Sequence, residues 1–204
     1  MQAEPLFWDV VEERRSIRKY KPDPVPAEMI ERILQAGVSA PNARNRQSWR
    51  FVVVREAETI DRLADALNEK FIQDLLADGR PEAEVYQKAV DRKARICGGN
   101  VIVVLFVDVA VLDSYSPEDP NKKEYLMAVQ SAALAGGQML LAGQALDLGG
   151  LWMGGPLHAQ RNMIDFFKLP ETWLAQGLLL FGYPAEKPEK KARVPMEQVV
   201  KYFS

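Results

Sequence analysis

Apolar residues recur along this chain with two different periods, and the alternation between them outlines the expected elements. Spacings of three and four residues, typical of one face of a helix, fill the longer segments. Continuous apolar runs rich in β-branched residues, typical of buried strands, lie between them. The predicted helices are residues 6–13, 27–36, 59–76, 82–96, 124–148, 158–167 and 195–202, and the predicted strands are residues 50–54, 101–107 and 175–181.

This mixture of elements predicts an α+β fold with a central mixed sheet surrounded by helices. The 204 residues show no break in composition, so we expect a single domain over residues 1–204. A hydrophobic content of 48% is ample for a packed core.

The segment 124–148 is the longest predicted helix, and it is rich in alanine and glycine. Small residues let neighbouring backbones approach closely, which predicts a buried central helix that also contacts a second subunit; a core helix without a subunit contact is the alternative. A membrane span is disfavoured because Gln130, Gln138, Gln144 and Asp147 interrupt the apolar run.

Charge and composition exclude several classes of function. The net charge of −2 argues against nucleic-acid binding, which needs a basic face. The single cysteine, Cys97, and the single histidine, His158, exclude a disulfide framework and an ordinary zinc site, and nothing near His158 suggests a catalytic triad. An acidic N-terminus without an apolar signal core, together with the lone thiol, predicts a cytoplasmic protein.

A cluster of cations near the N-terminus is the strongest chemical signal. Arg14, Arg15, Ser16 and Arg18 stand between an apolar helical segment and the proline-rich residues 22–26. Guanidinium groups bind phosphate oxygens bidentately, and a hydroxyl adds one short hydrogen bond. The cluster therefore indicates a phosphate site, although a solvated basic surface run would have the same residues.

A second polar stretch, residues 39–49, leads directly into the predicted strand 50–54. Pro41, Asn42, Asn45 and Gln47 lie in it, held in place by the strand that follows, which is where binding groups tend to occur. The alternative is a surface loop whose amide side chains bond their own backbone.

Glycines mark a third stretch. Gly149 and Gly150 precede an apolar run that ends at Gly154 and Gly155, but their spacing does not match a dinucleotide-binding fingerprint. Without a Cβ atom, Gly154 and Gly155 would allow backbone amides to approach a flat ligand, and an ordinary turn is the alternative.

These stretches, in this order, resemble the nitroreductase family. The resemblance rests on Arg14-Arg15-Ser16-Ile17-Arg18, on the run from Ala40 to Trp49, on Gly149 to Gly155, and on Gly182-Tyr183-Pro184 followed by Lys191-Ala192-Arg193-Val194-Pro195. Together they cover nearly the whole chain. The chain departs from the family at Ser48, where proline is usual, and at Gly154, where many relatives carry an acidic residue.

The resemblance implies a homodimeric oxidoreductase that binds FMN. Arg14, Ser16 and Arg193 would contact the FMN phosphate and ribityl chain, with Arg15 beside them and Lys191 assisting.

The resemblance also places a set of residues at the flavin ring: Arg18 at its polar edge, Asn45 and Gln47 in contact with it, and backbone groups of Gly154 and Gly155 near N5 and O4. Pro41 and Asn42 would serve the flavin of the partner protomer. Asn68 is a further candidate for a ring contact.

The activity implied is hydride transfer from NAD(P)H through FMN to a nitroaromatic, quinone or similar acceptor. No catalytic side chain is required, because the cofactor carries the reaction. The two substrates would use one pocket in turn, with ping-pong kinetics, and residues 70–92 would line or cover it. Alternatives are an enzyme that cleaves its own flavin, a dehalogenase, and a flavin-binding sensor without turnover.

Overall fold

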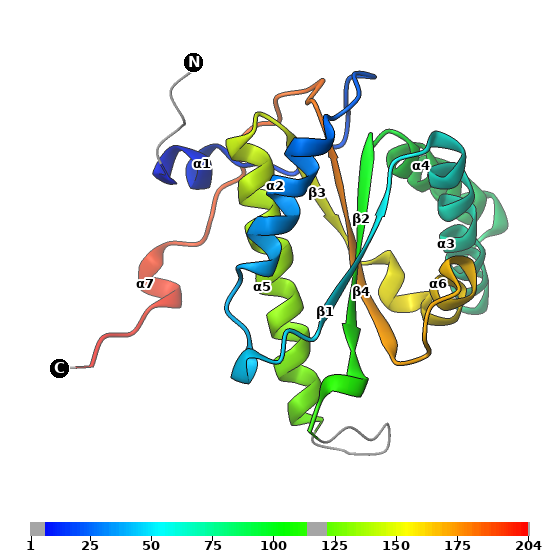
Figure 1. The fold of residues 1–204 in the computed structure, drawn as a ribbon. Helices are drawn as coiled ribbons and strands as arrows, with labels where there is room; N and C mark the ends of the chain where they lie inside the picture. The colour runs from blue at the N-terminus through cyan, green and yellow to red at the C-terminus, as the bar shows by residue number, and fades with distance from the viewer. Residues whose placement is uncertain (1–6, 114–121, 204) are drawn as a thin grey trace.

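The computed structural model describes residues 7–113 and 122–203, and Figure 1 shows their arrangement. The helices are α1 (Phe7–Glu13), α2 (Ala27–Val38), α3 (Ala57–Ala77), α4 (Glu82–Cys97), α5 (Lys123–Ala145), α6 (Gln160–Phe167) and α7 (Met196–Val199). The strands are β1 (Trp49–Val54), β2 (Val101–Asp108), β3 (Gly149–Met153) and β4 (Trp173–Gly182). Two 3-10 turns matter for the site, η1 (Ala43–Asn45) and η3 (Gly155–His158).

The sheet has the strand order β1-β2-β4-β3, and each neighbouring pair is antiparallel. The α+β prediction is confirmed, whereas the expectation of a mixed sheet is wrong for the described strands. Among the described residues, the parallel pairing is an isolated bridge between Ser16 and Gly150. Helices cover both faces of the sheet, so its central strands read as continuous apolar runs, and such runs do not distinguish parallel from antiparallel pairing.

The edge strand β3 was not predicted as a strand. Its first two residues are Gly149 and Gly150, and glycine is depleted in strands because it offers no side chain to pack. Pairing with β4 forms it nonetheless, in a register from Gly149 opposite Gly182 to Met153 opposite Leu178.

The sheet lies between two layers of helices, with α2 and α5 on one face and α3, α4 and α6 on the other (Figure 1). All eight residues of β2 are buried, and successive side chains point to opposite faces. Val103 and Leu105 pack with Met139 of α5, whereas Val104 and Phe106 pack in the cluster beneath α3 and α6. This double coverage explains the uninterrupted apolar run of residues 101–107.

Helix α5 is buried on one face only. Ala128, Ala132 and Met139 face the core, whereas Leu126 and Leu134 are 54% and 50% exposed. By length and composition alone, it is the one helix in the described residues that could cross a membrane. Its inner face packs on the strands, as the core helix of a globular domain does.

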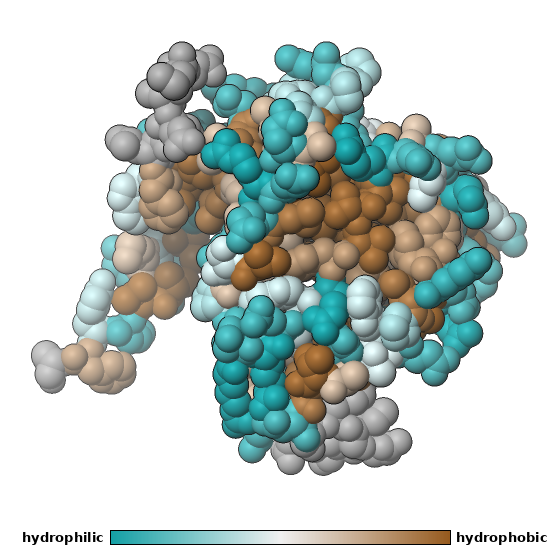
Figure 2. Space-filling view, viewed as in Figure 1, coloured by the Kyte–Doolittle hydropathy of each residue, from teal (hydrophilic) through white to brown (hydrophobic). Residues whose placement is uncertain are grey.

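The C-terminal tail extends away from the body of the molecule. After β4 it runs past α1 and carries α7 away from the body of the molecule (Figure 1). Figure 2 shows apolar side chains on this tail and on α1. The exposed apolar residues there are Phe7, Trp8, Val11, Val194, Met196, Val199, Tyr202 and Phe203.

Candidate functional site

The chain segments that follow α1 and β4 lie side by side, and backbone hydrogen bonds hold them together. The amide of Lys21 donates to the carbonyl of Tyr183 at 2.8 Å, and the amide of Ala185 donates to Lys19 at 2.9 Å. The carboxylate of Glu186 accepts from the backbone amides of Arg18, at 2.6 Å, and Lys19, at 3.2 Å. This pairing brings cations from the two ends of the sequence to one place.

Those cations line a cavity of about 160 Å³, which we call the cation cradle. Its lining residues are Arg14, Arg15, Ser16, Arg18, Pro188, Glu189, Lys191 and Arg193. Five of these eight residues are cationic and one is a carboxylate. Within the described residues, no ion pair neutralises any of the five cations. A bound anion would offset the repulsion between these like charges.

The cradle is anchored to the start of β3. The amide of Ile17 donates to the carbonyl of Gly150 at 3.0 Å, beside the Ser16–Gly150 bridge. A Cβ atom added to Gly149 would lie 2.7 Å from the side chain of Ile17, so this close approach requires glycine. The hydroxyl of Tyr20 donates to the carbonyl of Ile17 at 2.7 Å, and burial, followed by the charge of Glu186, raises the pKa of Tyr20.

A larger cavity of about 990 Å³, which we call the α5 groove, adjoins the cradle and shares Arg14 and Ser16 with it. Its other lining residues come from the outer face of α5 and from β3: Gln130, Ala133, Leu134, Gly137, Gln138, Leu140, Leu141 and Trp152. A cavity of 160 Å³ is smaller than most pockets for whole ligands, whereas one of 990 Å³ lies at the upper end of their range. The pair suits an elongated ligand with an anionic end.

Asn42 bonds to other residues of the loop 41–47, whereas the arginines of this loop pair with carboxylates outside it. The side-chain oxygen of Asn42 accepts from the amide of Gln47 at 2.8 Å, and its nitrogen donates to Asn45 at 3.4 Å. Asn45 and Gln47 have positive φ values of 53° and 50°. For Asn42, the structure therefore agrees with the alternative given above, a loop whose amide side chains hydrogen-bond within the loop itself.

This loop lies beside the first half of α5, at the Gln130 end of the α5 groove. The amide of Ala43 donates to the hydroxyl of Ser131 at 3.2 Å, in the first half of α5. A cavity next to the cradle is instead lined by Arg15 together with Gln144, thirteen residues further along. At 1.5 Å per residue, the two positions on α5 are about 20 Å apart. None of Pro41, Asn42, Asn45 and Gln47 lines the cradle of its own chain in the described residues.

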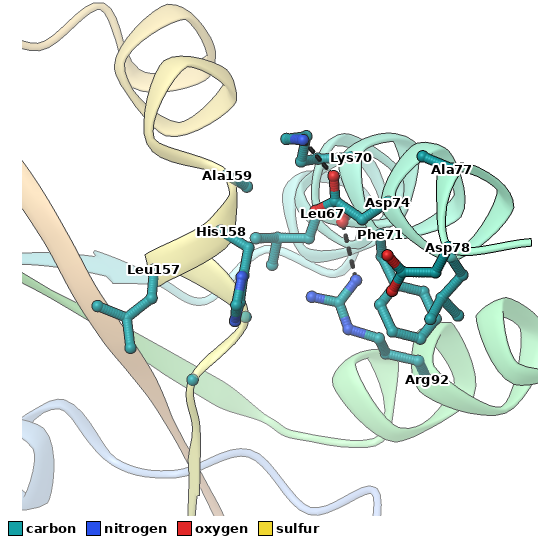
Figure 3. A pocket seen from close by; sticks show the side chains of 13 residues that line it. Leu67, Lys70, Phe71, Asp74, Ala77, Asp78, Arg92, Leu157, His158 and Ala159 are labelled. Atoms are coloured by element: carbon teal, nitrogen blue, oxygen red, sulfur yellow. Dashed lines mark hydrogen bonds and ion pairs between the residues drawn. The ribbon is translucent and has the colours of Figure 1, made fainter.

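Gly154 and Gly155 line a third cavity, of about 630 Å³, at the end of β3 (Figure 3). We call it the Arg92 pocket. Its other lining residues are Leu67, Lys70, Phe71, Asp74, Leu75, Ala77, Asp78, Arg92, Leu157, His158 and Ala159. Several of residues 70–92 line this cavity, whereas Val85 and Ala89 are buried, so α4 is an integral layer of the fold. The role of residues 70–92 in a shared substrate pocket stays a prediction.

Asn68, on α3, connects this helix to α4. Its side-chain nitrogen donates to the carbonyl of Ala89 at 2.8 Å, and its oxygen accepts from Arg92 at 2.9 Å. Both ends of the amide are therefore committed to α4, and the structure assigns Asn68 a part in helix packing.

The lining of the α5 groove was missed as a site. Gln130 and Gln138 entered the sequence analysis only as residues that disfavour a membrane span, although a signal for a site was present. Gln130, Leu134, Gly137, Gln138 and Leu141 share one helical face, which places polar groups on a surface that the core does not use.

The family model of the nitroreductase family matches residues 11–183, which is most of the chain. The chain belongs to the nitroreductase family. The match extends from α1 through β4 and includes the N-terminal cations and both glycine pairs.

Individual relatives agree with this membership. The chain is similar to an NADH dehydrogenase of Thermus thermophilus, with 30% identity over 211 residues, 92% of this chain and 91% of the relative. A nitroreductase-fold structure from Desulfovibrio desulfuricans in complex with FMN superposes with a TM-score of 0.74, 24% identity and 99% coverage of both chains. A BluB-like flavoprotein from Clostridium difficile has a TM-score of 0.79 at 20% identity, covering 98% of this chain and 100% of its own.

Proposed function

We propose that this nitroreductase-family protein is an FMN-dependent oxidoreductase that transfers hydride from NAD(P)H to a small aromatic or quinone acceptor. The observation that carries the proposal is the cation cradle, whose five cations have no carboxylate partner among the described residues and which adjoins the larger α5 groove. An NADH dehydrogenase among the relatives and FMN in a solved neighbour support the same class of chemistry.

The cradle fits the phosphate of FMN. Arg14 and Arg193 would each donate charge-assisted hydrogen bonds, Ser16 would add its hydroxyl, and Arg15 and Lys191 would supply further positive charge. Each such bond contributes about 1.5–3 kcal/mol when it is partly shielded from water.

The remainder of the cofactor would follow β3. This strand leads from Ser16 and Gly150 at the cradle to Gly154 and Gly155 at the Arg92 pocket. Backbone groups of Gly154 and Gly155 would orient the reactive edge of the ring. Arg18, expected at the ring edge, donates to the carbonyl of Ser16 at 3.1 Å and lines the cradle. We therefore propose that Arg18 also acts at the phosphate end.

When bound, FMN supplies the exchange of hydride, and the protein supplies binding, orientation and electrostatics. The cations hold the cofactor, and the apolar side chains of the α5 groove exclude water from its flat face. His158 is exposed and lines the Arg92 pocket, and the proposal assigns it no proton transfer.

We further propose a homodimer. The loop 41–47 lies about 20 Å along α5 from its own cradle, so Pro41, Asn42, Asn45 and Gln47 would serve the cofactor of the partner protomer. The exposed apolar residues of α5 and of the C-terminal tail would be covered by the same contact. Analytical ultracentrifugation of the diluted protein tests this, and a stable monomer that retains FMN would contradict it.

Donor and acceptor would occupy one site in turn, since the sequence has no separate dinucleotide fingerprint. Initial rates should then give parallel lines in plots of reciprocal rate against reciprocal NADH concentration at several acceptor concentrations. Intersecting lines would rule out the shared site.

The decisive experiment is spectroscopic. The purified protein should show flavin absorbance that bleaches under anaerobic conditions on addition of NADH or NADPH and returns on addition of a quinone or nitroaromatic. Quantitative recovery of FMN after many turnovers would exclude the flavin-cleaving alternative. Bleaching too slow to support turnover with either nicotinamide would instead favour a sensor.

A further inference from the structure

Arg92 is held rigidly inside the pocket that bears its name. Its Nη1 atom donates to the carbonyl of Leu67 at 2.8 Å and to the side-chain oxygen of Asn68 at 2.9 Å. Its guanidinium carbon lies 4.8 Å from the centroid of the Phe71 ring. Figure 3 shows the guanidinium extending from α4 towards α3 and the turn at His158. Three contacts therefore fix its orientation before any ligand arrives.

The charge of Arg92 is not neutralised by the residues around it. In the described part of the chain no carboxylate forms an ion pair with it, and Asp74 already pairs with Lys70. Asp78 also lines the pocket, but it is exposed, so solvent screens its charge. Burial lowers the pKa of the Arg92 guanidinium.

Arg92 also has unused hydrogen-bond donors. A guanidinium has five N–H groups, and within the described residues the hydrogen bonds of Arg92 come from Nη1 alone. Nε and Nη2 remain, and these two atoms form one of the edges that bind a carboxylate bidentately. Nη2 lies against Gly155, at the end of β3.

Part of the lining is apolar and offers a surface for a flat ring. Leu67, Phe71, Leu75 and Leu157 contribute apolar side chains to this cavity of about 630 Å³, and the charged or polar lining residues besides Arg92 are Lys70, Asp74, Asp78 and His158. A cavity that combines apolar walls with a few fixed polar groups is the usual design for a small ligand of defined orientation.

We propose that Arg92 makes this cavity a binding site for planar acceptors that carry a carboxylate, with the guanidinium as the group that recognises the anion. The inference rests on the proposed function for the reduction itself, and it names the substrate class of that reaction. For a nitro acceptor, the balanced first step is ArNO₂ + NADH + H⁺ → ArNO + NAD⁺ + H₂O.

Two other anions have the same chemistry and must be distinguished. The pyrophosphate of NAD(P)H would also satisfy Arg92, and so would an anionic part of FMN. Replacing Arg92 should change the dissociation constant of the acceptor if Arg92 binds the acceptor's carboxylate. It should change the KM for NADH if Arg92 binds the pyrophosphate, and the dissociation constant for FMN if Arg92 binds that cofactor.

The test compares 4-nitrobenzoate with 4-nitrobenzamide, which has nearly the same shape and no charge. The proteins are the FMN-loaded wild type, Arg92→Gln, Arg92→Lys, and the control Arg95→Gln, which removes an exposed arginine from the same helix. Dissociation constants come from quenching of protein fluorescence, and kcat/KM from turnover with NADH. Melting temperature and FMN content show that each variant is folded.

We expect the wild type to prefer the benzoate by about tenfold in both quantities, equivalent to about 1.4 kcal/mol. Arg92→Gln should abolish this preference with little effect on the benzamide. Arg92→Lys should retain part of it, since a lysine keeps the charge but not the bidentate edge. Arg95→Gln should behave as the wild type.

Equal binding of the two compounds by the wild type would overturn the inference, whatever the folding of the variants. A loss in Arg92→Gln that falls on the KM for NADH or on FMN affinity, with the benzoate preference intact, would also overturn it. If the wild type binds the benzoate preferentially but neither NADH nor NADPH bleaches its flavin, the proposed function fails and the anion site stands.

Discussion

The two ends of β3 hold two differently built sites for negative charge. At its start, the cation cradle gathers side chains from segments about 175 residues apart in sequence, and Arg18, Lys191 and Arg193 are exposed. At its end, a single half-buried guanidinium, Arg92, is fixed by Leu67, Asn68 and Phe71. The first site contains several cations, and the second contains one guanidinium held in a fixed orientation.

The difference suggests a division of labour. Several solvated cations attract a doubly charged group strongly and tolerate small changes in its position. One half-buried cation of fixed orientation discriminates between ligands, because a ligand without a matching anion leaves it unpaired. We therefore expect the cradle to determine cofactor affinity and the Arg92 pocket to determine acceptor selectivity.

The largest expected effect comes from removing the cradle's charge. Arg14→Ala and Arg193→Ala should each weaken FMN binding by about tenfold, and together by about a hundredfold if the two contacts are independent. Fluorescence titration of the apoprotein with FMN measures this. Unchanged affinity in both single variants would show that the cradle is not the phosphate site.

The next effect tests the junction between the cradle and β3. In Gly149→Ala, the new Cβ atom would lie 2.7 Å from Ile17, and such overpacking costs about 1–3 kcal/mol. The melting temperature should fall by about 2–12 °C. Gly137→Ala is the matched control, because no atom lies within 4 Å of its added Cβ. Equal stability of the two variants would contradict the close approach.

A smaller effect separates the two possible roles of Arg18. If it belongs to the cradle, Arg18→Gln should weaken FMN binding by about tenfold and leave the reduction potential of bound FMN within a few millivolts of the wild type. If it acts at the ring edge, the variant should bind reduced FMN about tenfold less tightly relative to oxidised FMN, which lowers the potential by about 30 mV. Dye-linked reductive titration measures the potential.

The smallest effect is a difference in salt dependence. Raising the ionic strength from 0.15 M to 1 M shortens the Debye length from about 8 Å to about 3 Å. FMN binding to the exposed cradle should weaken by about fivefold, whereas binding of 4-nitrobenzoate beside half-buried Arg92 should change by less than about twofold, since buried charges are screened less. Equal salt sensitivity at both sites would remove the distinction between them.

Much of the fold could be predicted from the sequence. The run of residues 101–107 indicated a buried strand because helices cover both of its faces, and the helical spacing of residues 59–76 and 82–96 anticipated α3 and α4. The edge strand β3 was not found, because a strand that begins with two glycines has little local preference and is formed by pairing with β4. The apolar runs also did not indicate whether the strands pair in the parallel or the antiparallel sense.

The sequence by itself determined which chemistry the chain carries: clustered arginines with Ser16, a lone histidine, and glycine pairs at both ends of one apolar run. Only the tertiary structure decided which of these groups meet. Arg193 reaches Arg14 because residues 183–186 pair with residues 18–21, and Arg92 reaches Gly155 because α4 packs on α3. Residue types are local and visible in sequence, whereas the proximity of distant segments is set by packing and pairing over the whole fold.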